Sequence, residues 1–99
     1  LPIAIMENGL PCDDRLVDGQ VADEGRIGFL REHLGALHRA IGRGVPVESY
    51  HLWSLLDNFE WAEGYSQRWG IVHVDHATQR RIPKASATWY RDVIARNGL

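Results

Sequence analysis

Strand-like and helix-like segments alternate along this sequence, and their order limits the folds that it can form. Residues 2–6 are a short continuous apolar run, which is typical of a strand buried on both faces of a parallel sheet. Apolar residues at three- and four-residue spacing then predict an amphipathic helix from about Asp23 to a stop before Gly42 or Gly44. β-Branched and aromatic residues predict a second strand over residues 45–53. This order predicts a right-handed βαβ unit with parallel strands.

The second half of the sequence predicts a loop, a small hairpin and a last helix. Residues 54–69 are expected to be the loop. Residues 70–75 predict a short strand, which returns over residues 80–82 after a turn. The last helix is expected to run from about Ser86, its N-cap, to Asn97. We therefore expect an α/β fold in which two parallel strands are each followed by a main helix, with a small hairpin before the second helix.

A chain of 99 residues with this pattern is too short to close a parallel sheet. Two parallel strands leave two open edges, and such edges promote pairing or aggregation. A closed eight-stranded barrel needs ~250 residues, so this chain supplies about a quarter of its strands. The chain also begins at Leu1 rather than at Met. We therefore expect a piece of a larger barrel, or a chain that associates to cover its sheet edges.

Composition excludes several classes of function. The 11 Lys and Arg residues and 13 Asp and Glu residues give a net charge of −2, which is not the basic surface of a general nucleic-acid binder. Cys12 is the single cysteine, so no internal disulfide forms. No apolar stretch approaches the ~20 residues that span a bilayer, and no signal-peptide pattern is visible. These features predict a cytoplasmic protein without nucleic-acid or membrane partners.

Acidic and aromatic residues follow both expected strands. Glu7 comes directly after the first strand, at the sheet edge where barrel enzymes place their active sites. A carboxylate there is suited to act as a nucleophile or a base, although capping a turn or pairing with an arginine is the simpler alternative. Residues 53–61 place Asp57, Asn58 and Glu60 between two tryptophans. Aromatic faces pack on sugar rings and such polar groups bind sugar hydroxyls, but tryptophans also pack in ordinary cores.

Two other groups of residues do not indicate a site. His73 and His76 lie on an expected strand and turn with no further ligand at metal-binding spacing, so no metal is predicted. Arg80, Arg81 and Lys84 are expected to form a solvated basic cluster at the end of the hairpin.

Two motifs resemble segments of glycoside hydrolase family 1, the β-glucosidases. Residues 5–9, I-M-E-N-G, resemble its T-E-N-G segment, and residues 53–61, W-S-L-L-D-N-F-E-W, look like its segment of the same sequence. Residues 68–72 and 84–87 are similar to the segments that follow. Order and spacing match across the chain. The resemblance therefore implies that residues 1–99 are a C-terminal fragment of a (β/α)₈ TIM-barrel domain, covering its last two βα units.

The resemblance also implies roles for five residues. Glu7 matches the catalytic nucleophile, and Glu60 and Trp61 match residues that hydrogen-bond the hydroxyls of the cleaved sugar. Trp53 matches the platform under that sugar. Trp69 matches an aromatic wall of the pocket, where the family often has Phe. The implied activity is that of a retaining β-glycosidase, which hydrolyses terminal β-linked glycosides through a covalent glycosyl-enzyme and needs no cofactor.

The sequence departs from the family pattern in two further respects. Met6 stands where the family often has Thr, next to the nucleophile. The family's acid/base lies in an Asn-Glu-Pro segment on an earlier strand, and this sequence contains no such segment. Retaining hydrolysis requires two carboxyl groups about 5–5.5 Å apart. Spacing alone leaves Asp57, Glu60 or Glu63 as substitutes.

Activity is therefore expected only together with the missing portion of the barrel, acting on a β-glycoside substrate. Glu60 would repel a phosphate, so an unphosphorylated sugar is favoured. Two alternatives remain at this point. One is an inactive fragment that self-associates through its sheet edges, and the other is a lectin-like module that binds sugar weakly through Trp53, Trp61 and Trp69.

Overall fold

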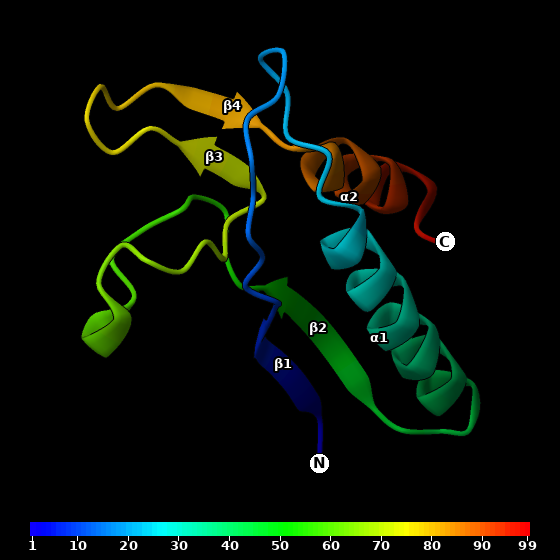
Figure 1. The fold of residues 1–99 in the computed structure, drawn as a ribbon. Coiled ribbons are helices and arrows are strands. Elements are labelled where there is room, and N and C mark those ends of the chain that lie inside the picture. Colours follow the sequence, from blue (N-terminus) through cyan, green and yellow to red (C-terminus); the bar gives the residue numbers. More distant parts are fainter.

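Two apolar strands form a parallel pair in the computed structural model, which describes residues 1–99. β1 (Ile3–Asn8) lies beside β2 (Val47–Leu52), with Ile3 opposite Val47 and Asn8 opposite Leu52. The chain crosses between the two strands through the long helix α1 (Glu24–Gly42), which runs alongside β2 in Figure 1. The predicted βαβ unit is thus confirmed.

The second half of the chain also has the predicted elements. β3 (Val72–Val74) and β4 (Arg81–Pro83) pair as an antiparallel hairpin. The helix α2 (Ala85–Arg96) follows and packs against α1 (Figure 1). The long loop before the hairpin contains one turn of 3₁₀ helix, η1 (Trp61–Glu63).

Three local expectations are wrong. β1 continues to Asn8, so Glu7 lies inside the strand rather than after it. β1 is not buried on both faces: Met6 is 65% exposed, because no segment of this chain packs over it. Ser86 is not the N-cap of α2, a position that Lys84 occupies, because the Ser86 hydroxyl instead donates to the carboxylate of Asp23 beside α1.

The molecule is flatter than a free-standing domain of its length. Its extents are 46 × 29 × 18 Å and its radius of gyration is 14.6 Å, whereas a compact domain of this size has about 13 Å. Only 14 of the 99 residues are buried. The largest fully buried side chains are Arg26, Lys84, Leu30 and Ser86, so the centre of the molecule is mainly polar. Neither helix is long and apolar enough to cross a bilayer.

Candidate active site

The carboxyl ends of β1 and β2 are tied together around Glu7. The Asn8 carbonyl accepts a hydrogen bond of 2.8 Å from the Trp53 backbone N–H, and its side-chain oxygen accepts one of 2.8 Å from the Tyr50 hydroxyl. Burial and the neighbouring Tyr90 raise the pKa of Tyr50 to about 12, so this hydroxyl remains a donor at neutral pH. These bonds fix the strand end that presents Glu7.

Glycine is required at the next position. A Cβ on Gly9 would lie 1.7 Å from the Trp53 carbonyl oxygen, which is far inside van der Waals contact. The absence of a side chain therefore allows the segment after Glu7 to approach the start of the second loop.

An open pocket of about 260 Å³ lies at these strand ends. The residues that line it are Glu7, Asn8, Gly9, Trp53, Glu60 and Trp69. The Trp53 indole N–H points at the Glu60 carboxylate across 3.4 Å. Four of the five residues predicted for the site thus line one cavity, although the loop that carries two of them is far from Glu7 in sequence. An aromatic face with two carboxylates is suited to hold a sugar ring and to react with it.

Trp61 is the fifth predicted site residue, and it does not line the Glu7 pocket. It lies in η1 with 82% of its surface exposed. Its side chain lines an adjoining depression of about 460 Å³, whose wall also includes Glu60 and Trp69. The two hollows therefore share a wall, with Trp61 at the outer side.

Asp57 and Asn58 do not face the pocket, contrary to the expectation that they contact a sugar. Asp57 is only 4% exposed, and its carboxylate accepts hydrogen bonds from Arg68 Nη1 at 2.6 Å and Lys84 Nζ at 2.8 Å. The Asn58 amide donates to the Ser54 hydroxyl within the same loop. Burial by itself would raise the pKa of Asp57, but the hydrogen bonds and charge of Lys84 and the bond from Arg68 hold it below its ordinary value. Asp57 is therefore ionised and is unsuited to serve as the missing acid.

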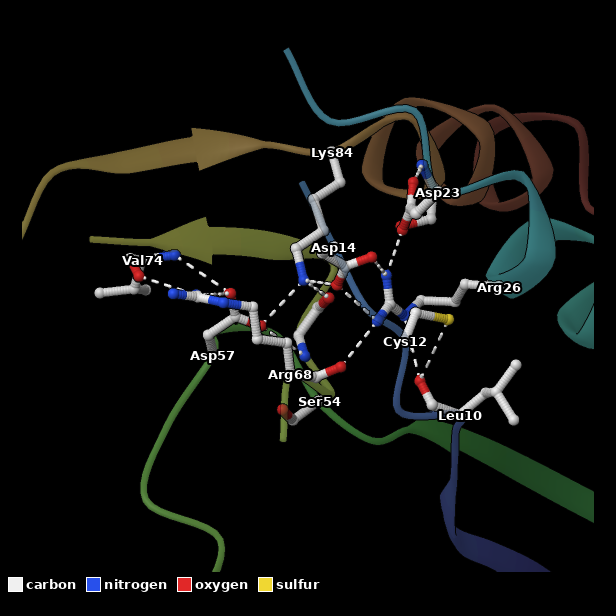
Figure 2. Close-up of polar contacts among 12 residues, drawn as sticks. Leu10, Cys12, Asp14, Asp23, Arg26, Ser54, Asp57, Arg68, Val74 and Lys84 are labelled. Atoms are coloured by element: carbon white, nitrogen blue, oxygen red, sulfur yellow. Dashed lines mark hydrogen bonds and ion pairs between the residues drawn. The ribbon is translucent and has the colours of Figure 1, made fainter. Parts of the chain in front are cut away.

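Lys84 is not part of a solvated cluster, as its sequence neighbours had suggested. It is 1% exposed and lies at the start of α2, from which its ammonium reaches between Asp14 and Asp57 (Figure 2). Six charged residues join in this way, and we call them the buried ion network: Asp14, Asp23, Arg26, Asp57, Arg68 and Lys84. Three carboxylates face three cations, so the network is neutral, as buried charges require.

Arg26 connects this network to the segment behind Glu7. Its guanidinium pairs with Asp14 and Asp23, and it also donates to the carbonyls of Leu10 at 3.2 Å and Arg68 at 2.8 Å (Figure 2). Burial lowers the pKa of Arg26, but the hydrogen bonds to the two carboxylates outweigh it and raise the pKa. Sequence reasoning missed this network because its members are far apart in the chain, and no local pattern distinguishes a buried charge from an exposed one.

The two histidines do not form a metal site. His73 is buried in β3, where burial lowers its pKa, while the ring of His76 packs against Tyr65 with centroids 4.5 Å apart. No three His, Cys, Asp or Glu side chains gather in the structure as they would around a metal ion.

A second close approach predicts a strong effect on stability. A Cβ on Gly70 would lie 2.3 Å from the backbone nitrogen of Asp57 and 2.4 Å from the carbonyl carbon of Leu56. We expect Gly70→Ala to lower the free energy of unfolding by about 2–3 kcal/mol, because backbone must move to admit the methyl group. Gly28→Ala is the matched control, since nothing lies within 4 Å of its added carbon. In α1 that change is expected to stabilise by about 0.4–1 kcal/mol. Urea unfolding followed by tryptophan fluorescence measures both, and equal midpoints would contradict the close approach.

The comparison with known proteins decides the family. The sequence model of glycosyl hydrolase family 1 matches residues 1–99, the whole of the chain. The chain belongs to this family. Among curated relatives, β-glucosidase A of Thermotoga maritima is 54% identical over 98 residues, which is 98% of this chain and 22% of the relative. A bifunctional β-D-glucosidase/β-D-fucosidase of Bifidobacterium breve is 48% identical over 100 residues, covering 96% of this chain and 22% of the relative.

Solved structures of this family agree with the chain in detail. A β-glucosidase from Thermotoga maritima in complex with castanospermine superimposes with a TM-score of 0.98 at 52% identity, covering 99% of this chain and 22% of that one. The same enzyme in complex with glucoimidazole also gives 0.98, at 54% identity over the same shares of the two chains. The two parallel strands and two helices are thus consistent with part of the family's TIM barrel. The chain spans about a fifth of the length of these relatives, 22% in each case.

Proposed function

We propose that these residues are the last two βα units of a (β/α)₈ retaining β-glycosidase that hydrolyses terminal β-linked glycosides such as β-glucosides. The observation that carries the proposal is the pocket in which Glu7, Trp53, Glu60 and Trp69 meet at the carboxyl ends of β1 and β2. Barrel enzymes place their active sites at this edge of the sheet. Relatives named β-glucosidases, one of them solved with glucoimidazole, support the choice of substrate class.

Glu7 is the proposed nucleophile. Its carboxylate oxygen bonds to the anomeric carbon as the bond from that carbon to the aglycone oxygen breaks, and an acid donates a proton to the leaving oxygen. Water then attacks the same carbon and releases Glu7, while the acid, now a base, takes the proton from the water. That second carboxyl group is proposed to come from an earlier strand of the complete barrel, since Asp57 is buried and committed to two cations.

The other residues of the pocket are proposed to bind the sugar. Trp53 offers an aromatic face to the C–H face of the ring, and Trp69 closes one wall. Glu60 accepts hydrogen bonds from hydroxyls, and Trp61 reaches the same ring only if it turns inward from the adjoining depression. The charge of Glu60 disfavours a phosphorylated sugar.

The proposal also accounts for the exposed apolar strand. Ile3 and Met6 face outward from β1 in this chain. In a closed barrel the neighbouring strands and the interior would cover such side chains.

A hybrid protein tests the proposal. Residues 1–99 replace the matching segment of Thermotoga maritima β-glucosidase A, to which they are 54% identical; we call this protein the hybrid enzyme. We expect it to hydrolyse 4-nitrophenyl β-glucoside, and the remainder of the Thermotoga protein without these residues to be inactive. A hybrid enzyme that shows native circular dichroism and a cooperative melt but no hydrolysis would contradict the proposal.

A further inference from the structure

The segment from Asp57 to Gly70 is a loop closed at its base by a single carboxylate. Asp57 Oδ1 accepts a hydrogen bond of 3.0 Å from the Gly70 backbone N–H, and Asp57 Oδ2 accepts the bond of 2.6 Å from Arg68. These two donors stand on either side of Trp69. The same oxygen also accepts from the Val74 N–H at 3.3 Å. Asp57 therefore holds both ends of the loop that carries Glu60 and Trp69.

The tip of this loop has few other attachments. Backbone hydrogen bonds of its tip residues stay within the loop, such as that of 2.7 Å from the Glu60 N–H to the Gly64 carbonyl. The tip contacts its surroundings through the 3.4 Å approach of Trp53 Nε1 to Glu60 and through the ring of Tyr65 on His76. Trp61 lies exposed. The orientation of the tip is thus determined mainly at its base.

The base is in turn fixed to the rest of the molecule through Lys84. Its ammonium donates to Asp57 at 2.8 Å, to the Gly70 carbonyl at 2.6 Å and to Asp14 at 2.5 Å (Figure 2). Asp14 belongs to the segment that follows β1. Lys84 therefore fixes the loop relative to the strand that presents Glu7.

From these contacts we propose that Asp57 is a positioning residue, whose carboxylate sets the place of Glu60 and Trp69 relative to Glu7. The inference rests on the proposed function. It explains why a fully buried carboxylate receives four hydrogen bonds, from Arg68, Gly70, Val74 and Lys84, within a loop whose tip lines the pocket. An asparagine at this position presents an NH₂ group to donors, so it loses acceptors on one side and leaves the two cations without their charge partner.

The expected effect follows from the sensitivity of catalysis to small displacements. In the hybrid enzyme we expect Asp57→Asn to lower kcat/KM for 4-nitrophenyl β-glucoside on the order of 100-fold, the loss that follows a displacement of about 1 Å. Ser86→Ala is the matched control: it removes another buried hydrogen bond, to Asp23, and leaves every ion pair in place. Its kcat/KM is expected to stay within about twofold of the unsubstituted hybrid enzyme.

A double-mutant cycle separates positioning from general loss of structure. If Asp57 acts through the loop tip, Asp57→Asn in a Glu60→Ala background should cost no more than about threefold beyond Glu60→Ala alone, because coupled residues are not additive. Equal losses in the two backgrounds, or a folded Asp57→Asn variant within threefold of the unsubstituted hybrid enzyme, would overturn the inference. A folded but inactive hybrid enzyme would instead overturn the proposed function, and the inference with it.

A milder change serves if Asp57→Asn does not fold. Arg68 keeps 23% of its side chain exposed, so Arg68→Gln removes one contact of the loop base and leaves the Asp57–Lys84 pair. We expect about a tenfold loss of kcat/KM, again suppressed in the Glu60→Ala background. An unchanged kcat/KM in folded Arg68→Gln would show that the base of the loop does not position its tip.

Discussion

Glu7→Gln is expected to lower kcat of the hybrid enzyme by on the order of 10⁴- to 10⁶-fold, as removal of groups of a nucleophilic catalytic unit does elsewhere. The amide keeps the size of the side chain but does not form a bond to the anomeric carbon. Because Glu7 is exposed at the strand end and lines the pocket, the change should leave the fold intact. Steady-state hydrolysis of 4-nitrophenyl β-glucoside measures kcat, and circular dichroism checks the fold.

Glu48→Gln is the matched control for this prediction. Glu48 is an exposed carboxylate on β2, outside the residues that line the pocket. Its removal should change kcat less than about twofold. A Glu7→Gln variant that retains more than a few percent of the activity would mean that another carboxylate attacks the sugar.

Lys84→Met is expected to have the largest effect on stability, lowering the free energy of unfolding by about 3–5 kcal/mol. The change leaves Asp14 and Asp57 buried with one cation fewer, and nothing else in the network can move to compensate. Arg80→Met is the control, because Arg80 is exposed on the hairpin and makes no ion pair. We expect Arg80→Met to lie within about 0.5 kcal/mol of the unsubstituted chain. Urea unfolding of the hybrid enzyme compares the two, and similar midpoints would contradict the buried position of Lys84.

The same variant should change the response to acid. The pKa of Asp57 lies below its ordinary value of 3.8 in the folded chain. A carboxyl group with a lowered pKa contributes stability above its unfolded pKa and loses that contribution as the pH falls through the folded pKa. We therefore expect the difference between the unsubstituted protein and Lys84→Met to be full near neutral pH and to shrink below about pH 3.8. Unfolding midpoints measured across this range check the trend, and a constant difference would contradict it.

Local patterns were enough to predict most of the elements. The period of the apolar residues between Ile27 and Ile41 gave α1 its correct extent, since a helix face repeats at short spacing. The position of Glu7 near a strand end, and the tryptophans after the second strand, were also visible in the sequence. Their meeting in one pocket depends on parallel pairing of β1 with β2, which the strand–helix–strand order predicts.

Long-range partners could not be predicted from local patterns. Ser86 has the type of residue that caps helices, but its hydroxyl turns to Asp23, 63 residues away in sequence. Lys84 stands two residues from Ile82 and near two exposed arginines, yet its partner Asp14 is 70 residues distant. Whether a charge is buried depends on which distant carboxylates surround it, and a single sequence does not record that. Trp61 likewise lies in the adjoining depression because a 3₁₀ turn directs it there.

Trapping of the glycosyl-enzyme tests the role of Glu7 most directly. The hybrid enzyme would be incubated with the 2,4-dinitrophenyl glycoside of 2-deoxy-2-fluoro-β-glucose, whose leaving group needs little help from an acid, and then analysed by intact-mass and peptide mass spectrometry. We predict the addition of one fluorosugar per chain, located on the peptide that contains Glu7 and absent from Glu7→Gln. An adduct on any other carboxylate, or none on a hybrid enzyme that hydrolyses 4-nitrophenyl β-glucoside, would contradict the account.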